Sequence, residues 1–280
     1  MTSPIRLGIF GWPVAHSKSP QMHEAAARAL GVELRYERFE VAPEDLAAAI
    51  AAKHAAGIRG YNLTVPHKEA MMSLIEDVAP AARAIGAVNT VVGADGQYLG
   101  YNTDAPGLVR SLEDAGVSIS GARVVVLGAG GAARAAVMGL ADAGAAEIRV
   151  LSRRPKQSEA LCRSMADAVG CSLEAAPLGE AGRHFRGASL LVQATSATLG
   201  SNPDARAFAD SLPIEALPIG AAVVDLVYKP LKTTLLARAE ARGLHTIDGL
   251  GMLLHQGAIA FEMWTGLEPP LDVMRAALND

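Results

Sequence analysis

The sequence predicts an α/β protein of two domains, one of them built on a doubly wound parallel sheet. The apolar run at residues 124–127 has the character of a strand that is buried on both faces. A glycine-rich turn and an alanine-rich helix follow it, and a second apolar strand at residues 148–151 completes a β-α-β unit. A chain of 280 residues is long enough for two domains with a substantial core.

The turn after the first of these strands has the spacing of a dinucleotide-binding loop. Gly128 permits the tight turn, Gly130 lets backbone approach a pyrophosphate, and Ala133 lets the helix pack closely on the strand. The helix N-terminus supplies N–H groups and a partial positive charge for phosphate. Because glycine-rich turns are common in α/β proteins, the loop alone also fits a purely structural role. The residues expected to contact a cofactor here are Gly128, Ala129, Gly130, Gly131 and Ala132.

The end of the next strand indicates which dinucleotide would bind. An NAD site usually has an acidic residue there for the ribose hydroxyls, but this chain has the segment LSRRPKQ. Arg153 and Arg154, after Ser152, can pair with a 2′-phosphate and stack on an adenine ring. The segment therefore favours NADP, and a solvated basic loop is the alternative.

Composition argues against several classes of function. No apolar run approaches the roughly 20 residues needed to cross a bilayer, and the N-terminal segment lacks the shape of a cleavable signal. A net charge of −4 gives no reason to expect nucleic-acid binding. Cys162 and Cys171 form no CxxC pattern and the histidines are scattered, so neither a disulfide nor a metal is expected. We expect a cytoplasmic protein with a small-molecule substrate.

The first predicted helix follows a loop that carries two serines. A strand at residues 5–10 leads into the loop, Ser19 reads as the helix N-cap with Pro20 in the first turn, and Gly31 ends the helix. Two hydroxyls beside a helix N-terminus, those of Ser17 and Ser19, can bind a carboxylate. Capping alone explains Ser19 equally well.

A lysine in the next part of the chain conflicts with its predicted surroundings. A strand at residues 36–41, a helix from Pro43 towards Gly57 and a strand at residues 58–65 precede Pro66, the expected first residue of another helix. Lys68 then lies in the first turn, where the helix dipole opposes a positive charge. Such conflicts are expected at functional sites, although a lysine that extends into water is the alternative.

A hairpin comes next, and polar residues flank it. After a helix ending near Ile85, two strands are joined by a turn at Asp95 and Gly96. Asn89 lies at the beginning of the hairpin. Asp104 falls in the first turn of the following helix, where the dipole favours a carboxylate and where helix capping alone also explains it.

The remaining chain fits a doubly wound sheet. Buried strands are expected at residues 189–193 and 222–227, with a turn-rich stretch at 198–218 between them, and a last strand at 244–247. Thr233 or Thr234 begins a helix to Arg242, Asp248 caps a long helix that Gly266 ends, and an amphipathic helix follows Pro269 and Pro270.

Several segments, in one order, resemble the shikimate dehydrogenase family. GWPVAHSKSP, NLTVPHK, GAVNT and GYNTD precede the GAGGAAR turn, and VVDLVYKPLKTTLL and DGLGMLLHQGAIAFEMWTG follow it. The resemblance covers nearly the whole chain. It implies an oxidoreductase that uses NADP to interconvert 3-dehydroshikimate and shikimate, in the pathway to chorismate and the aromatic amino acids.

The resemblance also implies roles for individual residues. Lys68 and Asp104 would form the catalytic pair, and Ser17, Ser19 and Tyr228 would hold the substrate carboxylate. The residues expected on the ring hydroxyls are Thr64, Asn89, Asp104 and Gln256. Further cofactor contacts would come from Ser152, Arg153, Arg154, Thr195, Val227, Gly249 and Met252.

The family resemblance also implies that the chain is divided into three parts. Residues 1–104 would bind the substrate, residues 105–248 would form a Rossmann-type domain for NADP, and residues 249–280 would return as helices to the first domain, in a monomer or a homodimer. The chain departs from the family at Ser152 and Gln193, where asparagine is usual. The alternatives are an NAD-using quinate/shikimate dehydrogenase, a member acting on an aminated analogue, and a catalytically silent NADP-binding regulator.

Overall fold

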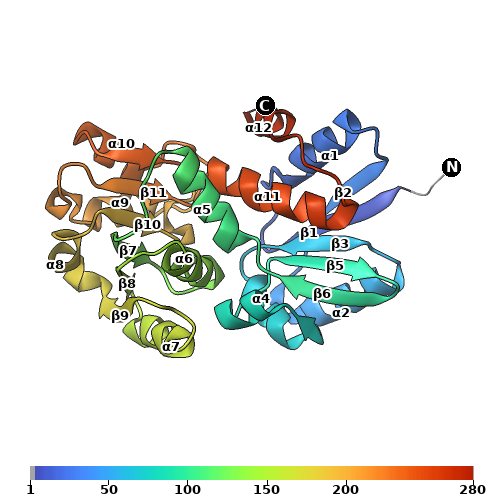
Figure 1. Cartoon of the computed structure of the whole chain (residues 1–280), viewed down its shortest axis with the longest axis horizontal. Helices are drawn as coiled ribbons and strands as arrows, with labels where there is room; N and C mark the ends of the chain where they lie inside the picture. The colour runs from blue at the N-terminus through green and yellow to red at the C-terminus, as the bar shows by residue number, and fades with distance from the viewer. Residues whose placement is uncertain (1–3, 280) are drawn as a thin grey trace. The chain divides into compact units, whose positions relative to one another are not determined.

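The chain folds into two α/β units, and one of them is built from two separate stretches of sequence. The computed structural model describes residues 4–279 (Figure 1). Unit 1 comprises the chain up to Gly107 together with the segment from Leu253 onward, and unit 2 comprises residues 108–252. The expected division after residues 104 and 248 lies close to these positions, and the roles assigned to the parts stay predictions. Two α/β units, one with a doubly wound sheet, confirm the predicted fold class.

Unit 1 contains a mixed sheet in which the strand order is β2-β1-β3-β5-β6-β4. Strand β1 runs parallel to both β2 and β3, whereas β5 runs antiparallel to β3 and β6. Asp95 and Gly96 both have positive φ in the β5–β6 turn, which confirms the predicted hairpin. The strands are β1 (Ile5–Gly11), β2 (Leu34–Glu40), β3 (Gly60–Leu63), β4 (Asp77–Val78), β5 (Thr90–Ala94) and β6 (Gln97–Tyr101).

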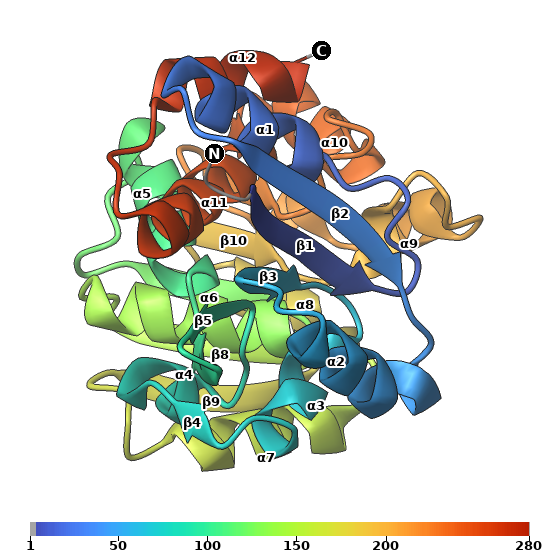
Figure 2. The same cartoon turned by 90° about the vertical axis from the view of Figure 1, so that its right-hand side faces the viewer.

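Helices cover both faces of this sheet. On one face, Phe10 and Tyr61 pack with Leu46 and Ile50 of α2. On the other, Leu7 and Ile9 pack with Trp264 of α11. Helix α12 lies beside α1 (Figure 2). The helices of this unit are α1 (Ser19–Ala29), α2 (Leu46–Ala55), α3 (His67–Ala70), α4 (Pro80–Ile85) and α12 (Leu271–Asn279), with short 3-10 turns at Pro43–Asp45 and Met71–Ser73. Helix α5 (Asp104–Asp114) begins in unit 1 and continues into unit 2, and α11 (Leu250–Thr265) begins in unit 2 and continues into unit 1.

Unit 2 contains a fully parallel sheet with the strand order β12-β11-β10-β7-β8-β9. The chain first builds outward from β7 to β8 and β9 and then restarts beside β7 with β10, so the direction of winding reverses between β7 and β10. Ligands of such sheets bind at that point, beyond the carboxyl ends of the strands. The strands are β7 (Arg123–Leu127), β8 (Glu147–Ser152), β9 (Ser172–Pro177), β10 (Leu190–Gln193), β11 (Ala222–Asp225) and β12 (His245–Ile247).

The helices of unit 2 lie on both faces of its sheet, as a doubly wound arrangement requires (Figure 1). Apolar residues of the strands, Leu127 and Leu191 among them, form one core with Phe185 of α8 and Leu235 of α10. The helices are α6 (Gly131–Asp142), α7 (Pro155–Met165), α8 (Ala181–Phe185), α9 (Ala205–Ser211) and α10 (Thr234–Ala241), with 3-10 turns at Leu178–Glu180, Ser196–Thr198 and Ile214–Ala216.

Several local predictions are confirmed and others are wrong. Asp248 Oδ1 accepts from Leu250 N at 2.9 Å, and Thr233 caps α10, both as predicted. Ser19 is the first residue of α1 and not its N-cap, because the helix begins one residue earlier than predicted and Lys18 holds the N-cap position. The Ser19 N–H donates to Ser17 Oγ at 3.3 Å. Helix α3 begins one residue after Pro66 and is only four residues long. The stretch expected to be turns at 198–218 contains α9.

Candidate active site

An ion pair between Lys68 and Asp104 lies at the centre of the unit 1 site. Lys68 Nζ is 2.6 Å from Asp104 Oδ2, and the two side chains are 14% and 5% exposed. Asn102 Oδ1 accepts from the N–H groups of Asp104 and Ala105, so the cap of α5 is supplied by Asn102. The Asp104 carboxylate is therefore available for the lysine, which excludes the alternative in which Asp104 serves only as a cap.

The buried amide of Asn89 holds the other oxygen of this carboxylate. Asn89, which is 1% exposed, donates from Nδ2 to Asp104 Oδ1 at 2.9 Å. The same amide lies 3.3 Å from Gln256 Oε1, while its oxygen accepts from Thr103 N at 2.7 Å. A Cβ at Gly107 would lie 2.7 Å from Gln256 N, so this glycine lets α11 approach α5 closely. The network fixes the orientation of the carboxylate.

Strand directions explain why residues distant in sequence meet here. Strands β1 and β3 are parallel, so the loops that follow them, with Ser17 and Thr64, leave the sheet at the same end. Strand β5 is antiparallel to β3, so Asn89, which precedes it, lies at that end as well. Strand β6 is antiparallel to β5 and delivers Asp104 to the same end.

The two serines lie side by side in the loop between β1 and α1. Ser17 and Ser19 are 5% and 1% exposed, and their Oγ atoms are 3.2 Å apart. Arg38 of β2 donates to the Ser17 carbonyl from Nε at 3.1 Å and from Nη2 at 2.6 Å. Between the serines, Lys18 Nζ donates to Leu278 O of α12. Both contacts restrain the serine loop.

Sequence reasoning missed Arg38, because nothing in its neighbourhood distinguishes it. Residues 34–40 mix exposed charged side chains with apolar ones, and Arg38 is one of four charged residues in the strand. Only the path of the chain brings Arg38 to Ser17, 21 residues earlier.

Chemically, the unit 1 site combines a proton donor with a fixed set of polar groups. A lysine ammonium can stabilise negative charge that develops on a nearby oxygen and can transfer a proton to it. The carboxylate and the amides of Asn89 and Gln256 can bond to hydroxyl groups of a ligand. Such a site suits reversible reduction of a polar ketone.

In unit 2 the glycine-rich turn has the features of a phosphate cradle. Gly128 has φ +113°, and a Cβ there would lie 2.7 Å from Thr195 Cγ2, so the loops after β7 and β10 are in close contact. Helix α6 begins at Gly131, and its N-cap Gly130 offers no side chain to bond the first N–H groups. Those donors and the positive end of a 12-residue helix suit a pyrophosphate.

The segment after β8 presents two exposed guanidinium groups. Arg153 and Arg154 are exposed, whereas Ser152 is 8% exposed. Ser152 Oγ donates to Arg154 O at 2.8 Å, so the serine shapes the arginine loop from within. The loop contains no carboxylate, and its charge suits a 2′-phosphate.

A buried polar network supports the loops after β10 and β11. Asp225 is fully buried and accepts from Thr233 Oγ1 at 2.8 Å and from Val227 N at 3.1 Å. Burial raises the pKa of its carboxyl group. Gln193 donates to Thr198 Oγ1 at 2.8 Å and accepts from Thr195 N, so the departure from asparagine is accommodated inside this network. Sequence reasoning missed Asp225, although an aspartate ending a buried strand was a usable signal.

The other expected cofactor contacts are small or apolar. A Cβ at Gly249 would lie 2.3 Å from Leu226 O, so only glycine fits there. Met252 and Val227 are 7% and 6% exposed. Tyr228 lies between β11 and α10 and is partly buried. Tyr228 belongs to unit 2 and the two serines to unit 1, so their joint role in carboxylate binding stays a prediction.

Residues 4–279 show neither a metal cluster nor a membrane-spanning helix. No group of three or more His, Cys, Asp or Glu side chains in that range is placed to hold a metal ion. No helix in it is long and apolar enough to cross a membrane.

Family models match three stretches of the chain. Residues 9–91 match the shikimate dehydrogenase substrate binding domain, residues 110–201 match shikimate/quinate 5-dehydrogenase, and residues 249–278 match the shikimate 5′-dehydrogenase C-terminal domain.

Similar proteins extend over almost the full chain. A shikimate dehydrogenase (NADP(+)) from Symbiobacterium thermophilum is 47% identical over 97% of this chain and 92% of its own. The crystal structure of shikimate 5-dehydrogenase from Thermus thermophilus, in complex with NADP(H) and shikimate, is 41% identical, covers 98% of both chains and superposes with a TM-score of 0.84. A quinate dehydrogenase from Corynebacterium glutamicum, in complex with NAD, is 32% identical, covers 99% of both chains and has a TM-score of 0.88. The ion pair, the glycine turn and identity of this extent together establish that the chain belongs to the shikimate dehydrogenase family.

Proposed function

We propose that this protein is an NADP-dependent shikimate dehydrogenase, which reversibly reduces the ring ketone of 3-dehydroshikimate to shikimate. The observation that carries the proposal is the Lys68–Asp104 ion pair, held in place by buried Asn89. The reaction belongs to the route to chorismate and the aromatic amino acids. The cytoplasmic location and the choice between monomer and homodimer stay predictions.

Residues of unit 1 bind and orient the substrate. Ser17 and Ser19 bind the carboxylate. Hydroxyls of the ring bond to Thr64, Asn89, Asp104 and Gln256. The support for this assignment is that the residues of unit 1 come together at one end of its sheet, where most of them are less than 10% exposed.

Lys68 handles the proton of the reaction. As the ketone is reduced, negative charge grows on its oxygen, and the ammonium group stabilises that charge and donates a proton. Asp104 keeps the ammonium in position through the 2.6 Å contact, and Asn89 keeps Asp104 in position. In the reverse direction the same pair withdraws the proton from the substrate hydroxyl.

NADP, when bound, supplies the hydride chemistry, and unit 2 supplies its binding groups. The turn from Gly128 to Ala132 holds the pyrophosphate, supported by the uncapped N-terminus of α6. Arg153 and Arg154 hold the 2′-phosphate. The nicotinamide side of the site is lined by Thr195, Val227, Gly249 and Met252.

The decisive experiment is an oxidation assay that crosses shikimate and quinate with NADP and NAD. We expect the highest kcat/KM with shikimate and NADP. If the protein still binds NADP but turns over none of the four pairs, the proposal is wrong and the protein is the catalytically silent NADP-binding regulator.

A second candidate function is quinate oxidation with NAD, favoured by the 32% identity to the Corynebacterium glutamicum enzyme. Arg153 and Arg154 oppose it, because the ribose of NAD offers a guanidinium no charge. Higher kcat/KM with quinate and NAD than with shikimate and NADP would establish it.

A further inference from the structure

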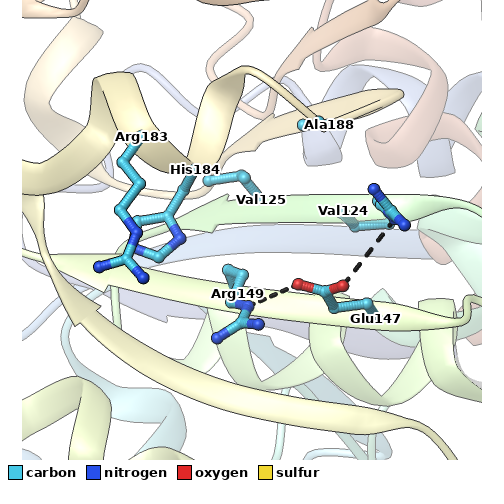
Figure 3. Close-up of a pocket in the computed structure, with 9 residues that line it drawn as sticks. Val124, Val125, Glu147, Arg149, Arg183, His184 and Ala188 are labelled. Atoms are coloured by element: carbon cyan, nitrogen blue, oxygen red, sulfur yellow. Dashed lines mark hydrogen bonds and ion pairs between the residues drawn. The ribbon is translucent and has the colours of Figure 1, made fainter.

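A cavity of about 210 Å³ lies in unit 2, where β7 and β8 begin (Figure 3). The glycine turn and the arginine loop follow the opposite ends of these strands. At about 3.3 Å per residue, the five residues of β7 separate the two ends by roughly 16 Å. The cavity is therefore distinct from the proposed cofactor site. Its walls are formed by Arg123, Val124, Val125, Glu147, Arg149, Arg183, His184, Gly187 and Ala188.

Three guanidinium groups and one carboxylate face this cavity, and the three arginines differ in how firmly they are paired. Arg149 is engaged, because its Nε bonds to Glu147 Oε1 at 2.6 Å and its Nη1 pairs with Glu174. The ion pairs of Arg123 with Glu147 and of Arg183 with Glu180 are 4.0 and 3.9 Å long, beyond hydrogen-bond distance. The guanidinium groups of Arg123 and Arg183 can therefore turn towards a ligand.

A buried imidazole nitrogen of the same cavity lacks a hydrogen-bond partner. His184 Nε2 has none within the described residues, and its nearest carboxylate oxygen, Glu180 Oε2, is 3.8 Å away. An unsatisfied buried polar atom is unfavourable, and a bound ligand would relieve that cost.

Two of the guanidinium groups act on this imidazole. Burial, followed by the charges of Arg149 and Arg183, lowers the pKa of His184, and the opposing effects of Glu180 and Glu147 are smaller. The carboxylates of Glu147, Glu174 and Glu180 balance the three guanidinium charges. An anion would therefore be held by charge-assisted hydrogen bonds from groups that can reorient, and not by a net positive charge. Figure 3 shows Arg183 and His184 of the α8 segment facing Arg149 and Glu147 of β8 across the cavity.

We propose that this cavity binds a small phosphate-bearing anion, held by Arg123 and Arg183 and by the N–H of His184. Guanidinium groups bind phosphate oxygens through paired, charge-assisted hydrogen bonds. The imidazole N–H can donate a further hydrogen bond to another phosphate oxygen. Sites for drug-sized ligands occupy about 300 to 1,000 Å³, so a volume of about 210 Å³ limits the ligand to a phosphate with a few attached carbons. A dinucleotide does not fit.

The test is a calorimetric titration of the full chain with inorganic phosphate and with glycerol phosphate. We expect saturable binding that weakens about tenfold or more in Arg183→Ala and in Arg123→Ala, since each removes a charged donor. His184→Phe keeps a ring but has no N–H, and it should weaken binding as well. Arg123 and Arg183 are 68% and 76% exposed, so these two variants should fold normally, which thermal unfolding checks.

Two controls separate this site from other basic surfaces. Arg186→Ala removes an exposed charge just after α8 without altering the cavity wall, and it should bind phosphate as the wild type does. The double variant Arg153→Ala, Arg154→Ala removes the competing arginine loop and should also retain binding.

Three results would overturn the proposal. These are absence of saturable heat in the wild type, unchanged affinity in Arg183→Ala, and loss of binding in the Arg153, Arg154 double variant only. Equal affinity for acetate at matched ionic strength would reject the phosphate specificity.

Discussion

The two units prepare their ligand-binding residues in different ways. In unit 1, Lys68, Asn89 and Asp104 are connected by side-chain hydrogen bonds and largely withdrawn from water. In unit 2, the cofactor residues are backbone groups of a glycine turn and two exposed arginines. Buried polar groups are costly to disturb, whereas exposed charges are screened by salt and contribute less. Substitutions should therefore have large, salt-independent effects in unit 1 and smaller, salt-dependent ones in unit 2.

The largest effect is expected from Lys68→Ala. Turnover should fall about 100-fold to 10,000-fold, the range of general acid–base contributions, while shikimate binding is largely retained. Steady-state kinetics and calorimetric binding measure the two quantities. Because the variant leaves the Asp104 carboxylate without its cation, thermal unfolding must first establish that the protein is folded. Near-normal turnover would remove Lys68 from the mechanism.

Ser17→Ala tests the carboxylate site. Loss of a hydrogen bond to a charged group costs about 1.5 to 3 kcal/mol, so the KM for shikimate should rise roughly 10- to 150-fold with a smaller change in kcat. Ser73→Ala is a matched control, because the Ser73 hydroxyl donates to Ala70 O, a backbone group at the end of the helix that contains Lys68. An unchanged KM in Ser17→Ala would mean that the carboxylate binds elsewhere.

Because His23 is buried in unit 1, the stability of the protein should fall at acid pH. This side chain is fully buried, stacks on Tyr36, and has a pKa lowered by burial to about 3. Between pH 6.5 and about 3 only the unfolded state binds its proton, so the free energy of unfolding should fall by about 1.4 kcal/mol per pH unit on acidification.

His23→Phe removes this titration, and urea unfolding of both proteins at pH 7.5 and pH 5 measures the difference. Burial lowers the pKa of His54 and of His67 in both proteins, so their contributions cancel. If the free energy of unfolding fell equally in the wild type and in His23→Phe between pH 7.5 and pH 5, the prediction would be contradicted.

Arg153→Ala tests the exposed cofactor-binding residues of unit 2. A single charged hydrogen bond corresponds to an NADP preference of roughly 10- to 150-fold, and exposure favours the lower end. The variant should lose most of the preference through weaker NADP binding, with NAD binding little changed. Arg163→Ala, an exposed arginine near the end of α7, is the control. Equal efficiency of the wild type with both cofactors at low salt would contradict the assignment.

The smallest effect is expected from Arg38→Ala. Arg38 bonds to the Ser17 carbonyl and to the neighbouring Gln21 side chain, so it acts by holding the Ser17 loop. A hydrogen bond of about 0.5 to 1.5 kcal/mol predicts a 2- to 10-fold rise in the KM for shikimate, with kcat unchanged. Arg38→Lys cannot make the paired contact, so its KM for shikimate should lie between those of the wild type and Arg38→Ala. A fall in kcat without a change in KM would argue against a positioning role.

Where the sequence predicted well, the signal was local. The buried strand at β7, the turn at Gly128 and the hairpin at Asp95 follow from the residues themselves, because buried runs and tight turns admit few residue types. Strand β9 was not predicted, because its alternating exposure at a sheet edge leaves a weak apolar pattern. The stretch around α9 forms a helix although its proline, serine and aspartate content favours turns.

By itself, the sequence determined the fold class, the dinucleotide-binding turn, the absence of an acid after β8 and the misfit of Lys68 in a helix start. The last three depend on residues within a few positions of one another, and the fold class depends on the order of strands and helices that are each recognised locally. Family resemblance implied that Lys68 pairs with Asp104, 36 residues further on, and the tertiary structure brings the two side chains together. Only the tertiary structure decided that Asn102, and not Asp104, caps α5 and that Arg38 restrains Ser17. These contacts depend on which strands run parallel and where their ends meet, and packing of the whole sheet sets that arrangement.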